Sequence, residues 1–149
     1  MKGNSDLPVE LWQNVSAIYR TGIKRLNSRL SSDRITFSQW SVLRALGKYG
    51  SMPMTRLSEH MLVAPANITG LVDRLEKNGY VERRKQSQDR RLFMIELTRK
   101  GRETQESISQ QFRGYVRRVF SPLSDDDRVE LLKLLRQLRT SIERIEKLE

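Results

Sequence analysis

The spacing of the apolar residues changes after Gly79, and this change restricts the folds that the chain can adopt. Before Gly79, apolar residues recur every three or four positions, as they do in amphipathic helices. After it, residues 80–84 and 92–97 are strand-like, and they flank a polar stretch at residues 85–91. The sequence therefore predicts helices that lead into a β-hairpin, which we call the wing (residues 80–97).

Two short helices are expected immediately before the wing. The first begins at Thr55. The second begins at Pro65, whose missing N–H costs nothing in a first helical turn, and it ends at Asn78 and Gly79. Two short helices followed by a basic hairpin form the layout of a winged helix-turn-helix, whose second helix lies in the major groove of DNA.

Longer helices are expected on both sides of this arrangement. One apolar stripe at helical spacing runs from Trp12 to Leu30, and another runs from Leu131 to Leu148. The capping-box pattern from Thr36 to Gln39 predicts a further helix, and Thr98 should begin a helix that reaches about Phe120.

The expected fold class is mainly α (α+β), with a winged helix-turn-helix lobe and long terminal helices. We expect an N-terminal dimerisation helix at residues 1–34, the DNA-binding lobe at 35–100 and C-terminal dimerisation helices at 101–149. The lobe is too small to cover both apolar stripes within one chain. The stripes are therefore predicted to be buried between the subunits of a homodimer.

The composition indicates a polyanionic partner and disfavours an enzyme. The formal net charge is +10, and such a surplus favours a polyanion through the release of condensed counterions, although an inert basic surface is the alternative. There is no cysteine and only one histidine, His60, which we place at the surface or near a phosphate. The sequence contains no glycine-rich phosphate loop and no paired-carboxylate motif. No catalytic residue, metal ligand or cofactor is predicted.

The sequence contains one cluster of acidic residues near the start of the last predicted helix. Three aspartates follow Ser124, and we interpret them as part of a helix cap rather than as a metal or acid site, because no second cluster completes such a site.

The longest apolar run, residues 61–66, is far shorter than the roughly 20 residues of a membrane span. The N-terminus lacks the apolar core of a signal peptide. We therefore expect a cytoplasmic protein with no membrane partner.

The second short helix has one apolar and one exposed face when it is placed on a helical wheel. The exposed face presents Ala66 and Gly70 at its centre, flanked by Asn67 and Thr69. Ala66 suits a thymine methyl group, and Asn67 suits an adenine edge. A glycine within a helix, such as Gly70, lowers stability by about 1 kcal/mol relative to alanine. Close approach of the helix backbone to DNA would explain why a glycine is present here. The alternatives are a tolerated defect or space for a neighbouring helix.

Basic residues are concentrated around the polar turn of the wing. Arginine tolerates the narrow minor groove better than lysine does, because its planar head is weakly hydrated. Asp89 is close enough in sequence to hold the guanidinium of Arg91. A merely solvated turn is the alternative interpretation. The five basic residues are Arg83, Arg84, Lys85, Arg90 and Arg91.

At these residues the sequence resembles the MarR family of bacterial and archaeal regulators. The resemblance covers about residues 36–102 and rests on the helix and its ending at residues 67–83, on Asp89-Arg90-Arg91, and on Leu97-Thr98-Arg99-Lys100-Gly101. It implies a homodimeric transcriptional regulator, here expected to be a repressor, that binds palindromic double-stranded DNA. It also implies release by a small aromatic or phenolic ligand.

Two departures from the family pattern bear on the expected sites. Ala64 stands where the family often has a capping serine or threonine, and Gly70 stands where many members have a polar or basic residue. The ligand site is expected at Tyr19, Arg20, Phe37 and Trp40, although Trp40 at helical spacing is more often a core residue. The expected DNA-binding residues are Pro65, Ala66, Asn67, Thr69, Gly70, Arg74, Arg83, Arg84, Lys85, Asp89, Arg90 and Arg91.

One alternative function is compatible with the same fold. An architectural nucleic-acid binder would use the same lobe without sequence preference, and it would show the same strong dependence on salt. Competition between a palindromic site and random duplex separates the two, because a regulator prefers its site by about 10³-fold or more.

Overall fold

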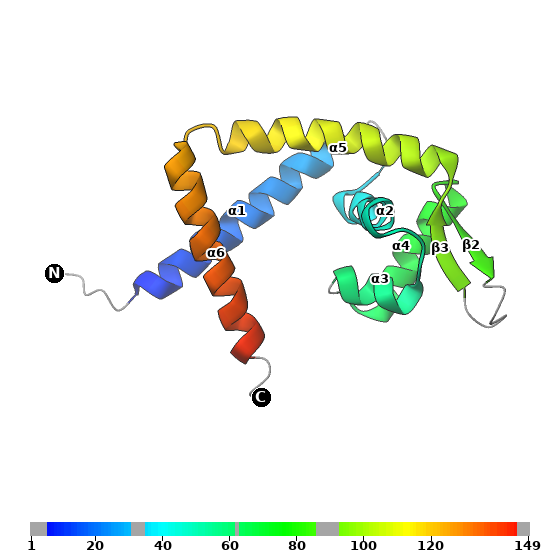
Figure 1. The fold of residues 1–149 in the computed structure, drawn as a ribbon, viewed down its shortest axis with the longest axis horizontal. Coiled ribbons are helices and arrows are strands. Elements are labelled where there is room, and N and C mark those ends of the chain that lie inside the picture. Colours follow the sequence, from blue (N-terminus) through cyan, green and yellow to red (C-terminus); the bar gives the residue numbers. More distant parts are fainter. Residues whose placement is uncertain (1–5, 31–34, 62, 86–92, 146–149) are drawn as a thin grey trace. The chain divides into compact units, whose positions relative to one another are not determined.

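A computed structural model of the chain describes residues 6–30, 35–61, 63–85 and 93–145. These residues form six helices and a small sheet in the order that the periodicity predicts, with one additional strand, and their arrangement can be followed in Figure 1. The residues fall into two compact units, 1–110 and 111–149, and α5 (Arg99–Val119) begins in the first and ends in the second. Each unit is described by itself.

The first unit begins with α1 (Leu7–Leu30), which starts five residues before the apolar stripe at Trp12. Pro8 lies in its first turn, where a proline is compatible with a helix. Only the C-terminal end of the stripe is buried, at Leu26 and Leu30, where α1 contacts α2 (Phe37–Tyr49). Trp12 and Tyr19 are about two-thirds exposed.

The predicted caps begin the helices of this unit. At the start of α2, the N–H of Gln39 donates to the Thr36 hydroxyl, and the N–H of Thr36 donates to the Gln39 side chain. This reciprocal pair is the predicted capping box, and it is confirmed. At the start of α5, the N–H of Gly101 donates to the Thr98 hydroxyl at 3.0 Å. The cap predicted at Thr98 is also confirmed.

The sheet has three antiparallel strands in the order β1-β3-β2. The wing strands are β2 (Val81–Lys85) and β3 (Phe93–Leu97), in a register that places Val81 opposite Leu97 and Arg83 opposite Ile95. β1 (Met52–Pro53) was not predicted, because two residues have no detectable period. It joins β3 through Met52 and Ile95, both of which are buried.

The core of the first unit lies between the helices and the sheet. α3 (Met54–Met61) and α4 (Pro65–Lys77) contact each other and α2, and α4 also contacts β2. Trp40 is 1% exposed, so the core interpretation of this residue is correct. The fully buried residues come from every layer, namely Trp40, Val42, Leu43, Met52, Leu57, Ile68, Val72, Leu75, Val81, Ile95 and Ile108.

The second unit contains the end of α5 and α6 (Asp125–Ile145). The N–H of Asp127 donates to the Ser124 hydroxyl at 3.1 Å, and the N–H of Ser124 donates back to the Asp127 carboxylate at 3.3 Å. The cap predicted at Ser124 is therefore confirmed. No residue of α6 is buried among the described residues, and Leu135, Leu138 and Ile142 are exposed. No helix within the described ranges is both long and apolar enough to cross a membrane.

Candidate nucleic-acid interface

The amphipathic character predicted for α4 is confirmed by burial. Ile68, Val72 and Leu75 are buried against the lobe. The opposite side is exposed at its N-terminal end, where Ala66, Asn67 and Thr69 lie. The exposed side is therefore made of small and polar residues, which is the composition that permits a helix to approach DNA bases closely.

The N-terminus of α4 has the weak cap that the sequence predicts. Ala64 makes no side-chain capping hydrogen bond, and its carbonyl accepts from the N–H groups of Asn67 and Ile68 at 2.9 and 3.2 Å. Pro65, the first residue of α4, is exposed. Since the positive end of the helix dipole lies here, this end of α4 favours an anion such as a phosphate.

Two polar side chains on α4 fold back onto their own helix. The Thr69 hydroxyl donates to the Pro65 carbonyl at 2.9 Å, and the Arg74 Nε donates to the Gly70 carbonyl at 2.9 Å. A β-carbon on Gly70 would meet only the Arg74 Nη2, at 3.6 Å, among the described atoms. No neighbouring helix that the structure describes therefore requires a glycine at position 70.

Arg83 extends from β2 to two carboxylates of α4. Its Nη2 lies 2.5 Å from the Asp73 carboxylate, and its Nη1 pairs with Glu76. The hydrogen bond to Asp73 raises the pKa of the Arg83 guanidinium above its ordinary value. The Arg83 side chain is 26% exposed. The structure therefore places this predicted DNA-binding residue in a bridge between the wing and α4.

The other basic residues of β2 differ from Arg83. Arg84, 67% exposed, pairs with Glu82 on its own strand at 2.9 Å and with Glu96 on β3. The Nζ of Lys85 lies 5.9 Å from the centre of the Phe93 ring. The remaining predicted wing residues, Asp89, Arg90 and Arg91, lie outside the described residues.

The end of α4 is held by the beginning of α5. The Thr98 hydroxyl donates to the Gly79 carbonyl at 2.7 Å, and the Lys100 Nζ donates to the Asn78 carbonyl at 2.8 Å. The same Nζ lies 4.4 Å from the centre of the Tyr80 ring. The cap at Thr98 was predicted from the sequence, whereas this junction was not, because the residues that it joins are 19 to 22 positions apart.

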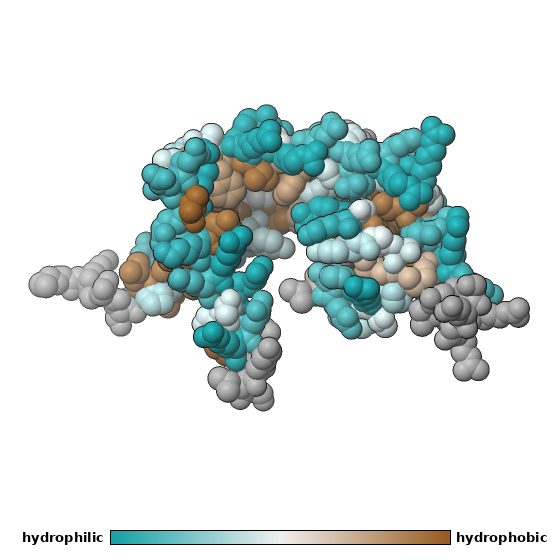
Figure 2. Space-filling model, viewed as in Figure 1, coloured by the Kyte–Doolittle hydropathy of each residue, from teal (hydrophilic) through white to brown (hydrophobic). Residues whose placement is uncertain are grey.

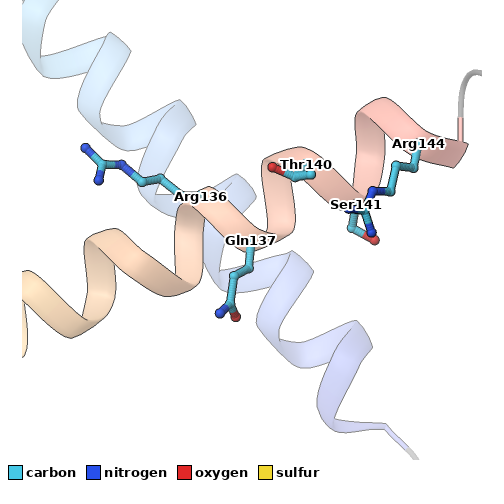
Figure 3. Close-up of a pocket in the computed structure, with 5 residues that line it drawn as sticks. All are labelled: Arg136, Gln137, Thr140, Ser141 and Arg144. Atoms are coloured by element: carbon cyan, nitrogen blue, oxygen red, sulfur yellow. The ribbon is translucent and has the colours of Figure 1, made fainter.

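The expected ligand residues do not line either of two hollows in the described part of the chain. Phe37 and Trp40 have ring centres 5.6 Å apart, whereas Tyr19 and Arg20 are exposed on α1. One hollow of about 380 Å³ in the first unit is lined by Leu46, Gly47, Gly50, Ser51, Glu96, Leu97, Arg102, Gln105 and Glu106. The other, of about 330 Å³, lies along α6, from which Arg136, Gln137, Thr140, Ser141 and Arg144 project (Figure 3).

The one histidine is at the surface, as predicted. The His60 ring stacks on Tyr49, with ring centres 4.6 Å apart and planes 7° apart. Among the residues that the structure places, no three histidine or acidic side chains are arranged to hold a metal ion.

Comparison with known proteins connects this geometry to a family. The MarR family model matches residues 35–93, which contain the helix-turn-helix and most of the wing. An uncharacterized HTH-type transcriptional regulator of Bacillus subtilis, YsmB, is 31% identical over 77% of this chain and 79% of its own length. The transcriptional activatory protein BadR of Rhodopseudomonas palustris is 27% identical over 91% of this chain and 78% of its own.

Solved structures agree with the sequence relatives. The crystal structure of the transcriptional regulator BldR from Sulfolobus solfataricus superimposes with a TM-score of 0.79 at 29% identity, covering 95% of this chain and 99% of BldR. Because both the helix-turn-helix sequence and the arrangement of the helices and sheet are shared with these regulators, this chain belongs to the MarR family of DNA-binding transcriptional regulators.

Proposed function

We propose that this regulator is a homodimer that reads a palindromic site, with α4 of each subunit in the major groove and each wing at the minor groove. The observation that best supports this proposal is the two-sided character of α4. Its apolar residues are buried in the lobe, while Ala66, Asn67 and Thr69 are exposed together near its N-terminus. In helix-turn-helix proteins, the N-terminal residues of the second helix contact the base edges.

Individual α4 residues have separate roles in this proposal. The Asn67 amide can donate to and accept from an adenine edge, and the Ala66 methyl group can contact a thymine methyl group. Thr69 gains access to a base when its hydroxyl leaves the Pro65 carbonyl. Arg74, on the shoulder of α4, contacts a phosphate, and Pro65 and Gly70 allow the backbone to come close to the DNA.

The wing contributes positive charge beyond the strand residues that are already paired. Arg83 and Arg84 are each in contact with two carboxylates, whereas Lys85 has no ion pair among the described residues. We therefore assign the DNA contacts of the wing to Lys85, Arg90 and Arg91, with Asp89 orienting one of the arginines. Arginines at the minor groove add preference for narrow A·T-rich segments, where the negative potential is concentrated.

Dimerisation explains the apolar surface that the terminal helices expose. Leu11, Trp12 and Ile18 on α1 are at least half exposed, and Figure 2 shows hydrophobic surface over the N-terminal part of this helix. α6 exposes Leu138 and Ile145 in the same way. Burial of these faces in a partner subunit removes apolar area from water, and it sets two α4 helices about 34 Å apart, one turn of DNA. We assign dimerisation to residues 1–34 and 101–149.

The direction of regulation and its release are further parts of the proposal. We propose repression, in which the dimer binds a site that overlaps a promoter and blocks polymerase. A reporter gene driven by the bound promoter should then be less active when the chain is present. Release by a small aromatic acid that binds at Tyr19, Arg20 and Phe37 stays a prediction, whereas Trp40, which was also expected at that site, is buried in the core. By linkage, operator DNA must weaken the binding of that acid by the same factor.

Two variants separate the roles of the helix and the wing. The duplex for this test is one that the full-length chain enriches from a random pool. Asn67→Ala should reduce the free energy of binding to this duplex by about 1–3 kcal/mol, and it should weaken the preference for one base at one position of each half-site. Replacing Arg90 and Arg91 with alanine should instead weaken binding to all duplexes. It should also reduce the slope of log affinity against log salt by about 0.9 for each phosphate that the variant no longer neutralises.

Asp89 requires a control, because the double replacement leaves its carboxylate unpaired near phosphate. A triple variant that also replaces Asp89 provides this control. If the double variant binds enriched and random duplexes as tightly as the parent at two salt concentrations, the wing is not a DNA-binding element. Equal affinity of the parent for both duplexes would instead favour the architectural binder.

A further inference from the structure

The position of Arg83 in the sheet directs it to α4. In a strand, alternate residues share one face, so Arg83 shares its face with Val81, which is buried. Arg83 also pairs across the sheet with Ile95, whose side chain is fully buried. α4 contacts β2. Arg83 is therefore the first polar residue after Val81 on the face of β2 that packs against the lobe.

α4 presents two carboxylates to this guanidinium. Asp73 and Glu76 are three positions apart, which places them next to each other on the helix surface. The two terminal nitrogens of Arg83 each reach one of them, Nη2 to Asp73 and Nη1 to Glu76. A planar guanidinium has donors in a fixed fork and can bridge two carboxylates, whereas the ammonium of a lysine is a single point charge.

Asp73 needs this partner if α4 lies in a groove of DNA. Its side chain is 56% exposed, on the side of α4 away from the buried Ile68, Val72 and Leu75. A free carboxylate there would repel the phosphates that flank the groove. Arg83 offsets this charge and at the same time joins the wing strand to the recognition helix.

We propose that Arg83 is a positioning residue, which fixes the wing against α4 and neutralises Asp73, and that it does not itself contact DNA. This inference rests on the proposed placement of α4 in the major groove. It separates Arg83 from Arg84, whose pairs lie within the wing and whose side chain is mostly exposed. The distinction concerns adjacent residues of the same type, so each can serve as a control for the other.

The test compares substitutions at Arg83 that remove or keep its charge. Full-length Arg83→Met, Arg83→Lys and Glu76→Gln variants are measured against a duplex enriched by the parent and against random duplex, at two salt concentrations. The matched controls are Arg84→Met and Arg84→Lys. Thermal unfolding of every variant reports whether it is folded at the temperature of the binding measurement.

The positioning role predicts that the two Arg83 variants behave alike. Both should bind the enriched duplex about 5–30-fold more weakly than the parent, a change of 1–2 kcal/mol, because neither can bridge the two carboxylates. Glu76→Gln, which keeps the arginine, should weaken binding in the same direction. On random duplex, Arg83→Lys should bind as the parent does, since it keeps the charge on which non-specific binding depends.

Direct binding of Arg83 to a phosphate predicts a different pattern. Arg83→Lys would then bind as the parent does, and Arg83→Met would lower the salt slope by about 0.9 for each phosphate left without its cation. Either that pattern, or parental affinity in Arg83→Met, overturns the inference. If the Met variant does not fold, Arg83→Lys and Glu76→Gln decide between the two roles. A parent with no preference for the enriched duplex would contradict the proposed function itself, which is a separate outcome.

Discussion

A β-carbon placed on Gly101 would lie 1.9 Å from the carbonyl oxygen of Tyr80. Gly101 is in the first turn of α5, and Tyr80 directly precedes β2. The same β-carbon would lie 3.0 Å from the Tyr80 carbonyl carbon. Both of these atoms belong to the backbone, which cannot rotate away as a flexible side chain can. The glycine of the Leu-Thr-x-x-Gly motif is therefore required by the junction between α4, the wing and α5.

Gly101→Ala should destabilise the fold. The backbone around Tyr80 or the first turn of α5 must shift, and overpacking of this kind costs about 1–3 kcal/mol. Urea unfolding measures the loss of unfolding free energy. A urea midpoint equal to that of the parent would show that the backbone at this junction can shift without loss of stability.

Gly70→Ala should have opposite effects on folding and on DNA binding. Among the described atoms, the new methyl group meets only the Arg74 side chain, at 3.6 Å. The unfolding free energy should therefore rise by about 0.5–1 kcal/mol, because alanine is the better helix former. DNA affinity should fall, since the methyl group occupies space between α4 and the bases. Higher stability with unchanged affinity would identify Gly70 as a tolerated helix defect.

Thr98→Val should weaken the attachment of α4 to α5. The substitution removes the acceptor for the N–H of Gly101 and the donor to the Gly79 carbonyl while keeping the shape of the side chain. Loss of an N-cap costs about 0.5–2 kcal/mol, which thermal unfolding can detect. Thr98→Ser keeps both hydrogen bonds and should remain close to the parent. Equal loss in the two variants would exclude the hydroxyl as the cause.

Leu138→Lys should separate the proposed dimer. Leu138 is 53% exposed in the single chain, on the apolar side of α6, and a symmetric interface would bury two of the new charges. Thr140→Lys, on the polar face of α6 seen in Figure 3, adds the same charge as a control. Sedimentation should give the mass of one chain for the first variant and of two for the second. A dimeric Leu138→Lys variant would place the interface elsewhere.

Local signals in the sequence predicted most of the helices. Thr36 with Gln39, Thr98, and Ser124 with Asp127 each begin a helix through hydrogen bonds between close neighbours, so their positions could be read from spacing alone. The apolar stripe identified α1 but did not define its first residue, because α1 begins at Leu7, five residues before the first member of the stripe at Trp12. β1 was missed because two residues have no period.

The candidate site could be predicted only in part, because its charges are paired over long distances in the sequence. The exposed face of α4 follows from a 3.6-residue period, and burial agrees with it. The basic wing was interpreted as one cluster of positive charge. In the structure, Arg83 is paired with α4 and Arg84 with Glu82 and Glu96. These pairs depend on the strand register and on the packing of β2 against α4, which a count of basic residues does not contain.

Selection of DNA sequences by the full-length chain tests the proposed mode of binding most directly. The chain is incubated with a pool of random duplexes, and the bound fraction is amplified and sequenced. A dimer with α4 of each subunit in the major groove predicts a two-fold symmetric motif, with half-sites about 10–10.5 base pairs apart or a multiple of this spacing. The motif should be preferred over random duplex by about 10³-fold or more. A pool without enrichment, or a single half-site without symmetry, would contradict a dimer that reads palindromic DNA.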